Sequence, residues 1–153
     1  MASKLAAAKM AAWSGVRTVI AAAERPGVLV GAVEGEPGVG TVVWPRDQRL
    51  SARKLWIGFA VQASGTVTVD EGARRALVER RTSLLPAGVI DVHGDFDPDD
   101  AVEIAEPSGR VFAKGLVRYG ATMLKGVAGS RTGDLPEGLP HEVVHRDDLV
   151  VLP

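Results

Sequence analysis

Cysteine is absent from this sequence of 153 residues, and aromatic residues make up only 5% of it. The chain therefore forms no disulfide and offers neither a thiolate ligand for a metal nor a cysteine nucleophile. A hydrophobic core needs most of the aromatic side chains, which leaves few to stack on nucleic-acid bases. No apolar run reaches the roughly 18 residues that a membrane span requires. We expect a cytoplasmic protein that does not insert into a membrane.

The sequence also lacks an excess of basic over acidic residues. The chain carries 18 basic and 19 acidic residues, for a net charge of −1, and residues 51–129 hold ten of each sign. Domains that hold nucleic acid through its phosphates usually carry more basic than acidic residues. The charge balance therefore disfavours nucleic acid as the main ligand, while the 46% of hydrophobic residues is enough for a folded core.

The most informative stretch runs from Gly65 to Gly94 and predicts a strand, a helix and a second strand. Residues 66–69 alternate polar and apolar side chains, as a half-buried strand does. Asp70 stands where a helix N-cap belongs, and Glu71 places a negative charge near the positive end of the helix dipole. Residues 89–93 leave a corner rich in Pro and Gly as the second strand.

Five short segments carry a resemblance to a known family: VDEGARRAL, SLLPAGV, HGDF, GLVRYG and VVHRDDLVVL. In this order they resemble the C-terminal PUA domain of bacterial glutamate 5-kinase. The N-terminal residues MASKLAAA look like the end of that enzyme's nucleotide-binding loop and the helix behind it, so the resemblance covers the whole chain. It implies an α+β fold, in which a small mixed β pseudo-barrel of the PUA type follows the αβ tail of a truncated α/β kinase domain.

The first 45 residues hold too few elements for a complete α/β domain. The residue pattern predicts helices at 3–14 and 28–33, the first with Ser3 as its N-cap, and strands at 16–23 and 40–44. Residues 16–23 show little alternation, which is typical of a strand buried on both faces in a parallel sheet. With the resemblance, residues 1–45 become the C-terminal remnant of an amino-acid-kinase domain. We expect the missing N-terminal kinase domain before Met1, which would then be an internal methionine.

Residues 46–153 are interpreted as a PUA-like domain with a C-terminal extension, beginning in a polar hinge. Ser51 is the expected cap of a helix that precedes the strand-helix-strand stretch. Further helices are expected at 51–62 and 121–128, and further strands at 102–105, 110–119, 142–145 and 149–152. The last two strands would flank a turn at residues 146–148, because Asp is a residue type that favours turns.

Ser3 and Lys4 are the candidate cofactor-binding residues. A lysine at the start of a helix can place its ammonium group beside nucleotide phosphates, while the helix N-terminus offers backbone N–H groups. Without the resemblance, a solvated surface lysine is the simpler interpretation. The resemblance assigns Ser3 and Lys4 to the phosphates of ATP. We expect ATP and Mg²⁺ as cofactors of the parent enzyme, none bound by this segment alone, and no catalytic or metal-binding residue within it.

Residues 145–147 read His-Arg-Asp, like the catalytic loop of protein kinases. That motif requires Asn five residues after the Asp, where this chain has Leu152, and it requires a glycine-rich loop that the chain lacks. We interpret the triplet as a turn. The three histidines, at positions 93, 141 and 145, match no common spacing of zinc ligands.

Four acidic residues have the spacing of the first, third, fifth and twelfth positions of an EF-hand loop: Asp95, Asp97, Asp99 and Glu106. Asp100 stands at the sixth position, where the sharp turn of a calcium loop calls for Gly. The flanking residues are expected to form strands rather than helices. A solvated acidic turn is the preferred interpretation, with calcium as the alternative.

The resemblance implies transfer of the γ-phosphoryl group of ATP to the side-chain carboxylate of glutamate, the first step of proline biosynthesis. The parent enzyme is expected to be a homo-oligomer in which the PUA part is regulatory or structural. Because most of the required groups would lie before Met1, we predict that this chain alone is inactive. The alternatives are a stand-alone PUA-type module that binds RNA and a scaffold domain without either activity.

Overall fold

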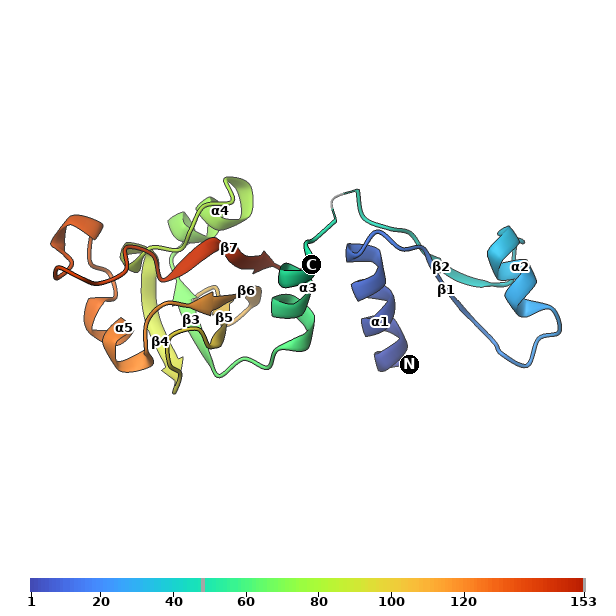
Figure 1. Ribbon diagram of the computed structural model, residues 1–153, viewed down its shortest axis with the longest axis horizontal. Coiled ribbons are helices and arrows are strands. Elements are labelled where there is room, and N and C mark those ends of the chain that lie inside the picture. The colour runs from blue at the N-terminus through green and yellow to red at the C-terminus, as the bar shows by residue number, and fades with distance from the viewer. Residues whose placement is uncertain (48, 153) are drawn as a thin grey trace. The chain divides into compact units, whose positions relative to one another are not determined.

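The computed structural model describes residues 1–47 and 49–152, which divide into two compact units (Figure 1). The first unit runs from Met1 to Leu55 and the second unit begins at Trp56. This division falls ten residues after the domain boundary expected at residue 45. Among the described residues, no helix combines the length and the apolar character needed to cross a bilayer.

The first unit consists of short helices and a two-stranded antiparallel ribbon. Thr18 of β1 pairs with Val43 of β2, and Ala21 pairs with Gly40. All four residues of β1 are half-buried, so the prediction of a strand buried on both faces in a parallel sheet is wrong within the described residues. The elements in order are α1 (Ala2–Trp13), β1 (Thr18–Ala21), α2 (Val28–Glu34), β2 (Gly40–Val43) and α3 (Ala52–Leu55).

Helix α1 begins one residue earlier than predicted. Met1 occupies the N-cap position, so Ser3 lies in the first turn and does not cap the helix. Alanine is the strongest helix former, and the alanine-rich sequence of α1 suits a helix without a side-chain cap. Gly15, with φ of 78°, ends the helix as expected because a residue without Cβ adopts this left-handed conformation at little cost.

The second unit is built around a five-stranded mixed sheet in the order β4-β3-β5-β6-β7. Strands β3 and β5 are parallel, and the other neighbouring pairs are antiparallel. This mixed sheet, accompanied by helices, confirms the predicted α+β class. The elements in order are η1 (Trp56–Ala60), β3 (Gly65–Val69), α4 (Glu71–Glu79), η2 (Pro86–Gly88), β4 (Val89–Gly94), β5 (Ala101–Ala105), β6 (Val111–Val117), α5 (Ala121–Val127), η3 (Thr132–Asp134) and β7 (Val144–Val151).

The predicted strand-helix-strand stretch is confirmed in detail. Asp70 Oδ1 accepts a hydrogen bond of 2.7 Å from the backbone N–H of Ala73, which makes Asp70 the cap of α4. Leu77 faces inward and is buried. Strands β3 and β4 then pair along their length, with Val67 opposite Val92. Local capping and alternating hydrophobicity were therefore sufficient to predict this part of the fold.

The end of the chain differs from the prediction. Residues 144–151 form the single strand β7, so the expected turn at residues 146–148 is wrong. The pairing of β7 with β6 shifts register between Gly115 and Val117, and this irregularity accommodates the polar run without ending the strand. Leu84 forms an isolated antiparallel bridge with Val144, which extends the contacts of β7 beyond the sheet order.

The connection into the second unit also departs from a simple helix. Ser51 Oγ accepts a hydrogen bond of 3.3 Å from the backbone N–H of Lys54, so the predicted cap is confirmed. The α-helix ends at Leu55, and residues 56–60 form the π-helix η1. Ile57 of η1 is fully buried, which shows that η1 packs within the second unit. The spacing of apolar residues in the sequence did not indicate that Ile57 would be buried.

Candidate functional site

Ser3 and Lys4 both lie in the first turn of α1 and both side chains are exposed. The backbone N–H of Lys4 donates to the carbonyl of Met1 at 3.1 Å. No acidic residue stands in this turn, so the positive end of the helix dipole and the Lys4 ammonium are not neutralised locally. This arrangement can hold an anionic group such as a phosphate.

The opposite end of α1 is held by the segment that follows β2. The backbone N–H of Arg46 donates to the carbonyl of Ala12 at 2.9 Å, and that of Leu50 donates to Trp13 at 3.0 Å. The Arg46 guanidinium also lies 4.7 Å from the centre of the Trp13 ring, within the range of a cation–π contact. These contacts fix the C-terminal end of the helix, and Ser3 and Lys4 lie at the other end.

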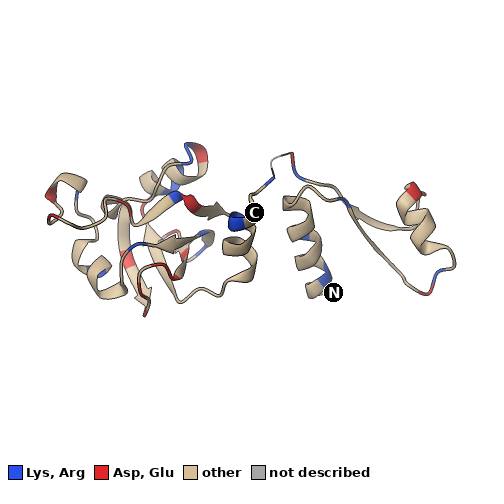
Figure 2. Ribbon diagram, in the orientation of Figure 1, with Lys and Arg blue, Asp and Glu red and all other residues tan. Residues whose placement is uncertain are grey.

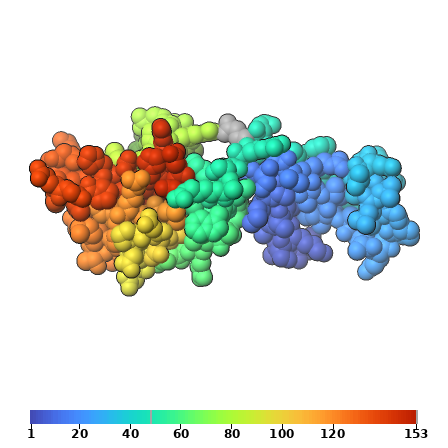
Figure 3. All heavy atoms as spheres, in the orientation of Figure 1, coloured from blue at the N-terminus to red at the C-terminus, as the bar shows by residue number. Residues whose placement is uncertain are grey.

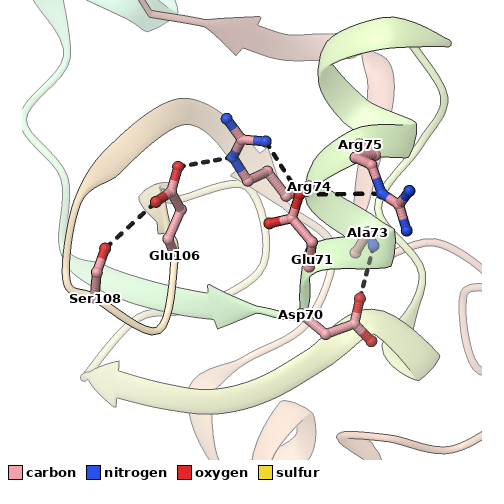
Figure 4. Close-up of polar contacts among 7 residues, drawn as sticks. All are labelled: Asp70, Glu71, Ala73, Arg74, Arg75, Glu106 and Ser108. Atoms are coloured by element: carbon pink, nitrogen blue, oxygen red, sulfur yellow. Dashed lines mark hydrogen bonds and ion pairs between the residues drawn. The ribbon is translucent and has the colours of Figure 1, made fainter.

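A second polar cluster lies in the second unit, between α4 and the turn that joins β5 to β6 (Figure 4). Arg74 Nε donates to Glu106 Oε1 at 2.7 Å, and Arg74 Nη1 lies 3.3 Å from Glu71 Oε1. The hydrogen bond from Arg74 is the main cause of a lowered pKa for Glu106, and the same bond raises the pKa of Arg74. Since both charged groups are paired with each other, the cluster fastens α4 to the β5–β6 turn.

The acidic run does not form the calcium loop that its spacing suggested. Glu106, the twelfth position, is engaged by Arg74. The backbone N–H of Asp97 donates to Asp100 Oδ2 at 3.0 Å, and Asp99 adopts φ of 73°, so this run folds into a compact turn. Among residues 1–47 and 49–152, no three His, Asp or Glu side chains are placed to hold a metal ion together.

A pocket of about 650 Å³ opens beside this acidic turn, against the first turn of α5. Asp95 and Asp97 contribute its polar side, and Phe96 and Val127 contribute apolar surface. The backbone N–H of Ala121 donates to the carbonyl of Phe96 at 2.9 Å, which fixes α5 beside the turn. The sequence suggested no pocket here, because the two walls are separated by more than twenty residues.

Lys114 is a buried charged residue that the sequence analysis did not single out. It lies on β6, and its Nζ donates a hydrogen bond to the backbone carbonyl of Val61, just after η1. Burial lowers the pKa of Lys114, and the charge of Glu103, directly opposite on β5, acts in the other direction. A lysine inside an otherwise apolar strand was the available signal. Its position ties the end of η1 to the sheet.

Tyr119 is a second buried polar side chain that the sequence did not reveal. Its hydroxyl donates to the backbone carbonyl of Pro140, at the end of the loop that precedes β7. Burial raises the pKa of the Tyr119 hydroxyl, so the group stays protonated and able to donate this bond. With Phe96 and Phe112, Tyr119 belongs to the core. Trp44 and Trp56 are 68% and 52% exposed, so the expectation that the core takes most of the aromatic side chains is wrong.

Two of the three histidines, His93 and His145, make separate local contacts. His93 Nε2 lies 2.8 Å from Asp91 Oδ2 on strand β4. His145 Nδ1 accepts a hydrogen bond of 3.2 Å from the backbone N–H of Asp147 within β7. His145 therefore makes a local structural bond, and it lies within a strand and not at a turn.

Comparison with known proteins agrees with this architecture, since residues 65–139 match the PUA domain family. The chain is 44% identical over 156 residues to a glutamate 5-kinase of a Synechococcus species, covering 99% of this chain and 42% of that protein. It is 46% identical over 156 residues to the glutamate 5-kinase of Myxococcus xanthus, covering 99% of this chain and 41% of that protein.

This chain is a homologue of the C-terminal part of the glutamate 5-kinases. It spans about two fifths of the length of these curated relatives. A crystal structure of a PUA domain from Aeropyrum pernix is similar at 22% identity and a TM-score of 0.45, covering 61% of this chain and 48% of that one. The match to the PUA family covers residues 65–139, which lie in the second unit, and the similarity to glutamate 5-kinases covers the first unit as well.

Proposed function

We propose that this chain acts as part of a glutamate 5-kinase, a phosphotransferase that moves the γ-phosphoryl group of ATP to the side-chain carboxylate of glutamate. The observation that carries the proposal is the similarity to glutamate 5-kinases across 99% of the chain, which includes the first unit as well as the PUA domain. The products are ADP and an acyl phosphate, so no oxidant or reductant is needed. A cytoplasmic location and a homo-oligomeric parent enzyme are part of the proposal.

Within this chain, Ser3 and Lys4 are the residues that would hold the nucleotide phosphates. Lys4 brings a positive charge to a helix N-terminus whose first turn contains no carboxylate, which suits the negative charge of a triphosphate. Mg²⁺, when bound, would neutralise charge on the phosphates. We assign residues 1–45 to the C-terminal remnant of the kinase domain and residues 46–153 to the PUA-like part, which is structural or regulatory.

The first test compares this chain with a longer polypeptide that also contains the kinase portion found in the relatives. With ATP, Mg²⁺ and glutamate, we expect acyl phosphate, trapped as its hydroxamate, from the longer polypeptide and none from the 153-residue chain. Formation of the hydroxamate by the 153-residue chain would contradict the assignment of the catalytic groups to the kinase portion.

The second test addresses Lys4 in the longer polypeptide. Lys4→Ala removes one charged contact to phosphate, which corresponds to about 2 kcal/mol or about a 30-fold loss in kcat/KM for ATP. Lys9→Ala is the matched control, because Lys9 is an exposed lysine on the same helix, away from its first turn. Equal effects of the two substitutions would remove Lys4 from the phosphate site.

The alternative, an RNA-binding PUA module, is tested by titrating the chain with single-stranded and hairpin RNA at several salt concentrations. Figure 2 shows basic and acidic residues distributed over both units. Binding through phosphates requires a complex that weakens steeply as salt rises. A micromolar or tighter complex with this salt dependence would favour the RNA-binding function over a purely structural or regulatory PUA domain.

A further inference from the structure

Helix α2 presents its largest apolar side chains away from its own unit. Leu29 and Val33 are each 80% exposed and Val30 is 61% exposed. At 100° per residue these three positions lie within an arc of about 100° on one side of the helix, which we call the α2 ridge. Gly31, on another side, is buried. A surface helix of a complete domain has the opposite arrangement, with its large apolar residues inward.

The inner side of α2 is packed through its smallest residue. A Cβ atom on Gly31 would lie 3.0 Å from Val39 Cγ2, so α2 approaches the segment before β2 closely at this point. Val39 is buried by this approach. The contact holds α2 in place within the first unit while the α2 ridge stays exposed. The light-blue spheres of α2 form part of the outer surface of the first unit (Figure 3).

The two arginines beside α2, Arg17 and Arg25, are engaged inside the first unit. Arg17 Nη2 donates to the carbonyl of Ala32 at 2.5 Å, at the C-terminal end of the helix. Arg25 donates to the carbonyl of Gly38 at 2.7 Å and lies 3.5 Å from Glu36. Figure 2 shows α2 without charge except at one end. The α2 ridge is therefore suited to an apolar protein surface and offers no charge for a nucleic acid or a lipid headgroup.

The ribbon beneath α2 is also incomplete as a sheet. In the described part of the chain, β1 and β2 pair only with each other, so each has an outer edge available for a further strand. An isolated two-stranded ribbon is marginally stable in water. Among the described residues of the first unit, the buried apolar side chains are those of Ala8, Ala12 and Val39. A core of this size requires an additional neighbour.

We propose that the α2 ridge is the docking face for the kinase portion present in the longer relatives and outside the matched region. This inference rests on the proposed function. More than half of the length of those relatives lies outside the match, which is enough chain to supply an apolar surface and sheet edges. Docking on the ridge holds the ribbon and α1 in place, and thereby positions the phosphate-binding turn of Lys4.

The test measures hydrogen–deuterium exchange of residues 18–43 in the 153-residue chain and in the longer polypeptide. We expect exchange in this segment to be about 100-fold slower in the longer polypeptide, because docking suppresses local opening. The double variant Leu29→Glu/Val33→Glu in the longer polypeptide should remove most of this protection and leave that of β3 to β7 unchanged. Retained protection in the double variant would overturn the proposal.

Ile90→Glu is the matched control, since Ile90 is an aliphatic residue in the second unit that is 54% exposed and has no proposed partner. It should leave exchange of residues 18–43 unchanged. A second copy is the competing occupant: a dimer of the 153-residue chain in sedimentation, abolished by Leu29→Glu/Val33→Glu, would overturn docking of the kinase portion.

Kinase activity of the unsubstituted longer polypeptide separates the two proposals. Ridge-dependent protection in an inactive polypeptide would leave the docking face in place and reject the kinase function. Activity combined with ridge-independent protection would reject the docking face alone.

Discussion

Helices α2 and α4 obey the same local rules but face opposite environments. On α4, Leu77 is buried, the charged side chain of Arg75 is exposed, and that of Arg74 is half-buried against Glu106. On α2, glycine is buried and the large apolar residues Leu29 and Val33 lie outside. The second unit therefore encloses its own core, and the first unit exposes the surface with which it would complete one. The local sequence can favour a short helix whose stability still depends on packing against a neighbour.

The cores of the two units differ accordingly. The second unit has one contiguous hydrophobic cluster, in which Leu77 of α4 and Leu124 of α5 pack with side chains of the sheet such as Ile104; all three are buried. The first unit buries mainly alanine among its described residues, and alanine contributes little apolar area. We therefore expect the second unit to resist unfolding in the 153-residue chain more strongly than the first.

The largest expected difference in stability comes from truncating one leucine to alanine in each unit. Leu124→Ala should lower the free energy of unfolding of the second unit by about 2–5 kcal/mol, because it leaves a cavity in a packed core. Leu29→Ala in the 153-residue chain should change stability by less than about 0.5 kcal/mol, because this side chain is exposed. Urea titration with exchange measured in each unit gives both values. Similar costs for the two substitutions would remove the contrast between the units.

Replacing Gly115 by alanine is expected to destabilise the second unit by a smaller amount. A Cβ on Gly115 would lie 2.4 Å from Val144 Cγ1 and 3.0 Å from the carbonyl oxygen of Asp148, between strands β6 and β7. Gly115→Ala should cost about 1–3 kcal/mol through overpacking, measured by urea denaturation.

Gly31→Ala is the comparison in the first unit, where the nearest atom to the new Cβ would be the exposed carboxylate of Glu36 at 2.5 Å. This carboxylate can rotate away, Val39 Cγ2 at 3.0 Å must move by a few tenths of an ångström, and alanine favours the helix by up to about 1 kcal/mol. We expect little loss of α2 protection in hydrogen exchange. A larger loss for Gly31→Ala than for Gly115→Ala would mean that the first unit is the more tightly packed of the two.

The caps of α4 and α1 provide the next comparison. Asp70→Ala should destabilise the second unit by about 1 kcal/mol, because the N–H of Ala73 loses its acceptor. Ser3→Ala should leave the stability of α1 nearly unchanged, since Ser3 lies inside the first turn and makes no capping bond. Thermal unfolding followed by circular dichroism measures the first, and exchange of α1 amides measures the second. Loss of α1 protection in Ser3→Ala would identify a capping role in solution.

The smallest effect concerns pH. The pKa of Glu106 is lowered in the folded chain by the hydrogen bond from Arg74, so its contribution to stability is present above the unfolded pKa and is lost as the pH falls through the folded pKa. When the pH falls from about 6 to about 3, the free energy of unfolding should decrease more for the unsubstituted chain than for the Glu106→Gln variant.

Glu36→Gln in the first unit is the control, because its pairing with Arg25 at 3.5 Å joins two half-exposed side chains, and such pairs contribute little. Unfolding free energies at each pH provide the measurement. Parallel pH profiles for the chain and Glu106→Gln would show that the Arg74–Glu106 pair does not stabilise the folded state.

Sequence reasoning succeeded where a contact is local. Asp70 and Ser51 were recognised as caps because the bonds they accept come from residues three positions away. It failed for β7, where residues 146–148 favour a turn in isolation. They lie instead in the irregularity between two paired positions, Leu149 opposite Gly115 and Val144 opposite Val117, so the strand continues through them. It also missed Lys114, whose partner, the carbonyl of Val61, is 53 residues away.

The candidate site shows the same division. Ser3 and Lys4 were selected by resemblance, and their placement in the first turn of a helix follows from local helix propensity. The pocket between the acidic turn and α5 could not be foreseen, because its walls meet only through the packing of separate elements. The family match and the order of motifs agree, since four of the five motifs lie within the matched residues 65–139.

By itself, the sequence determined the helices and most strands, the caps, and the relationship to glutamate 5-kinases, since each depends on residue order over short distances. Only the tertiary structure decided that β1 joins an antiparallel ribbon, that β7 is continuous, and that Leu29 and Val33 face outward. Apolar periodicity shows that a helix has a side to bury, but which side meets a neighbour depends on the surfaces that the rest of the protein provides.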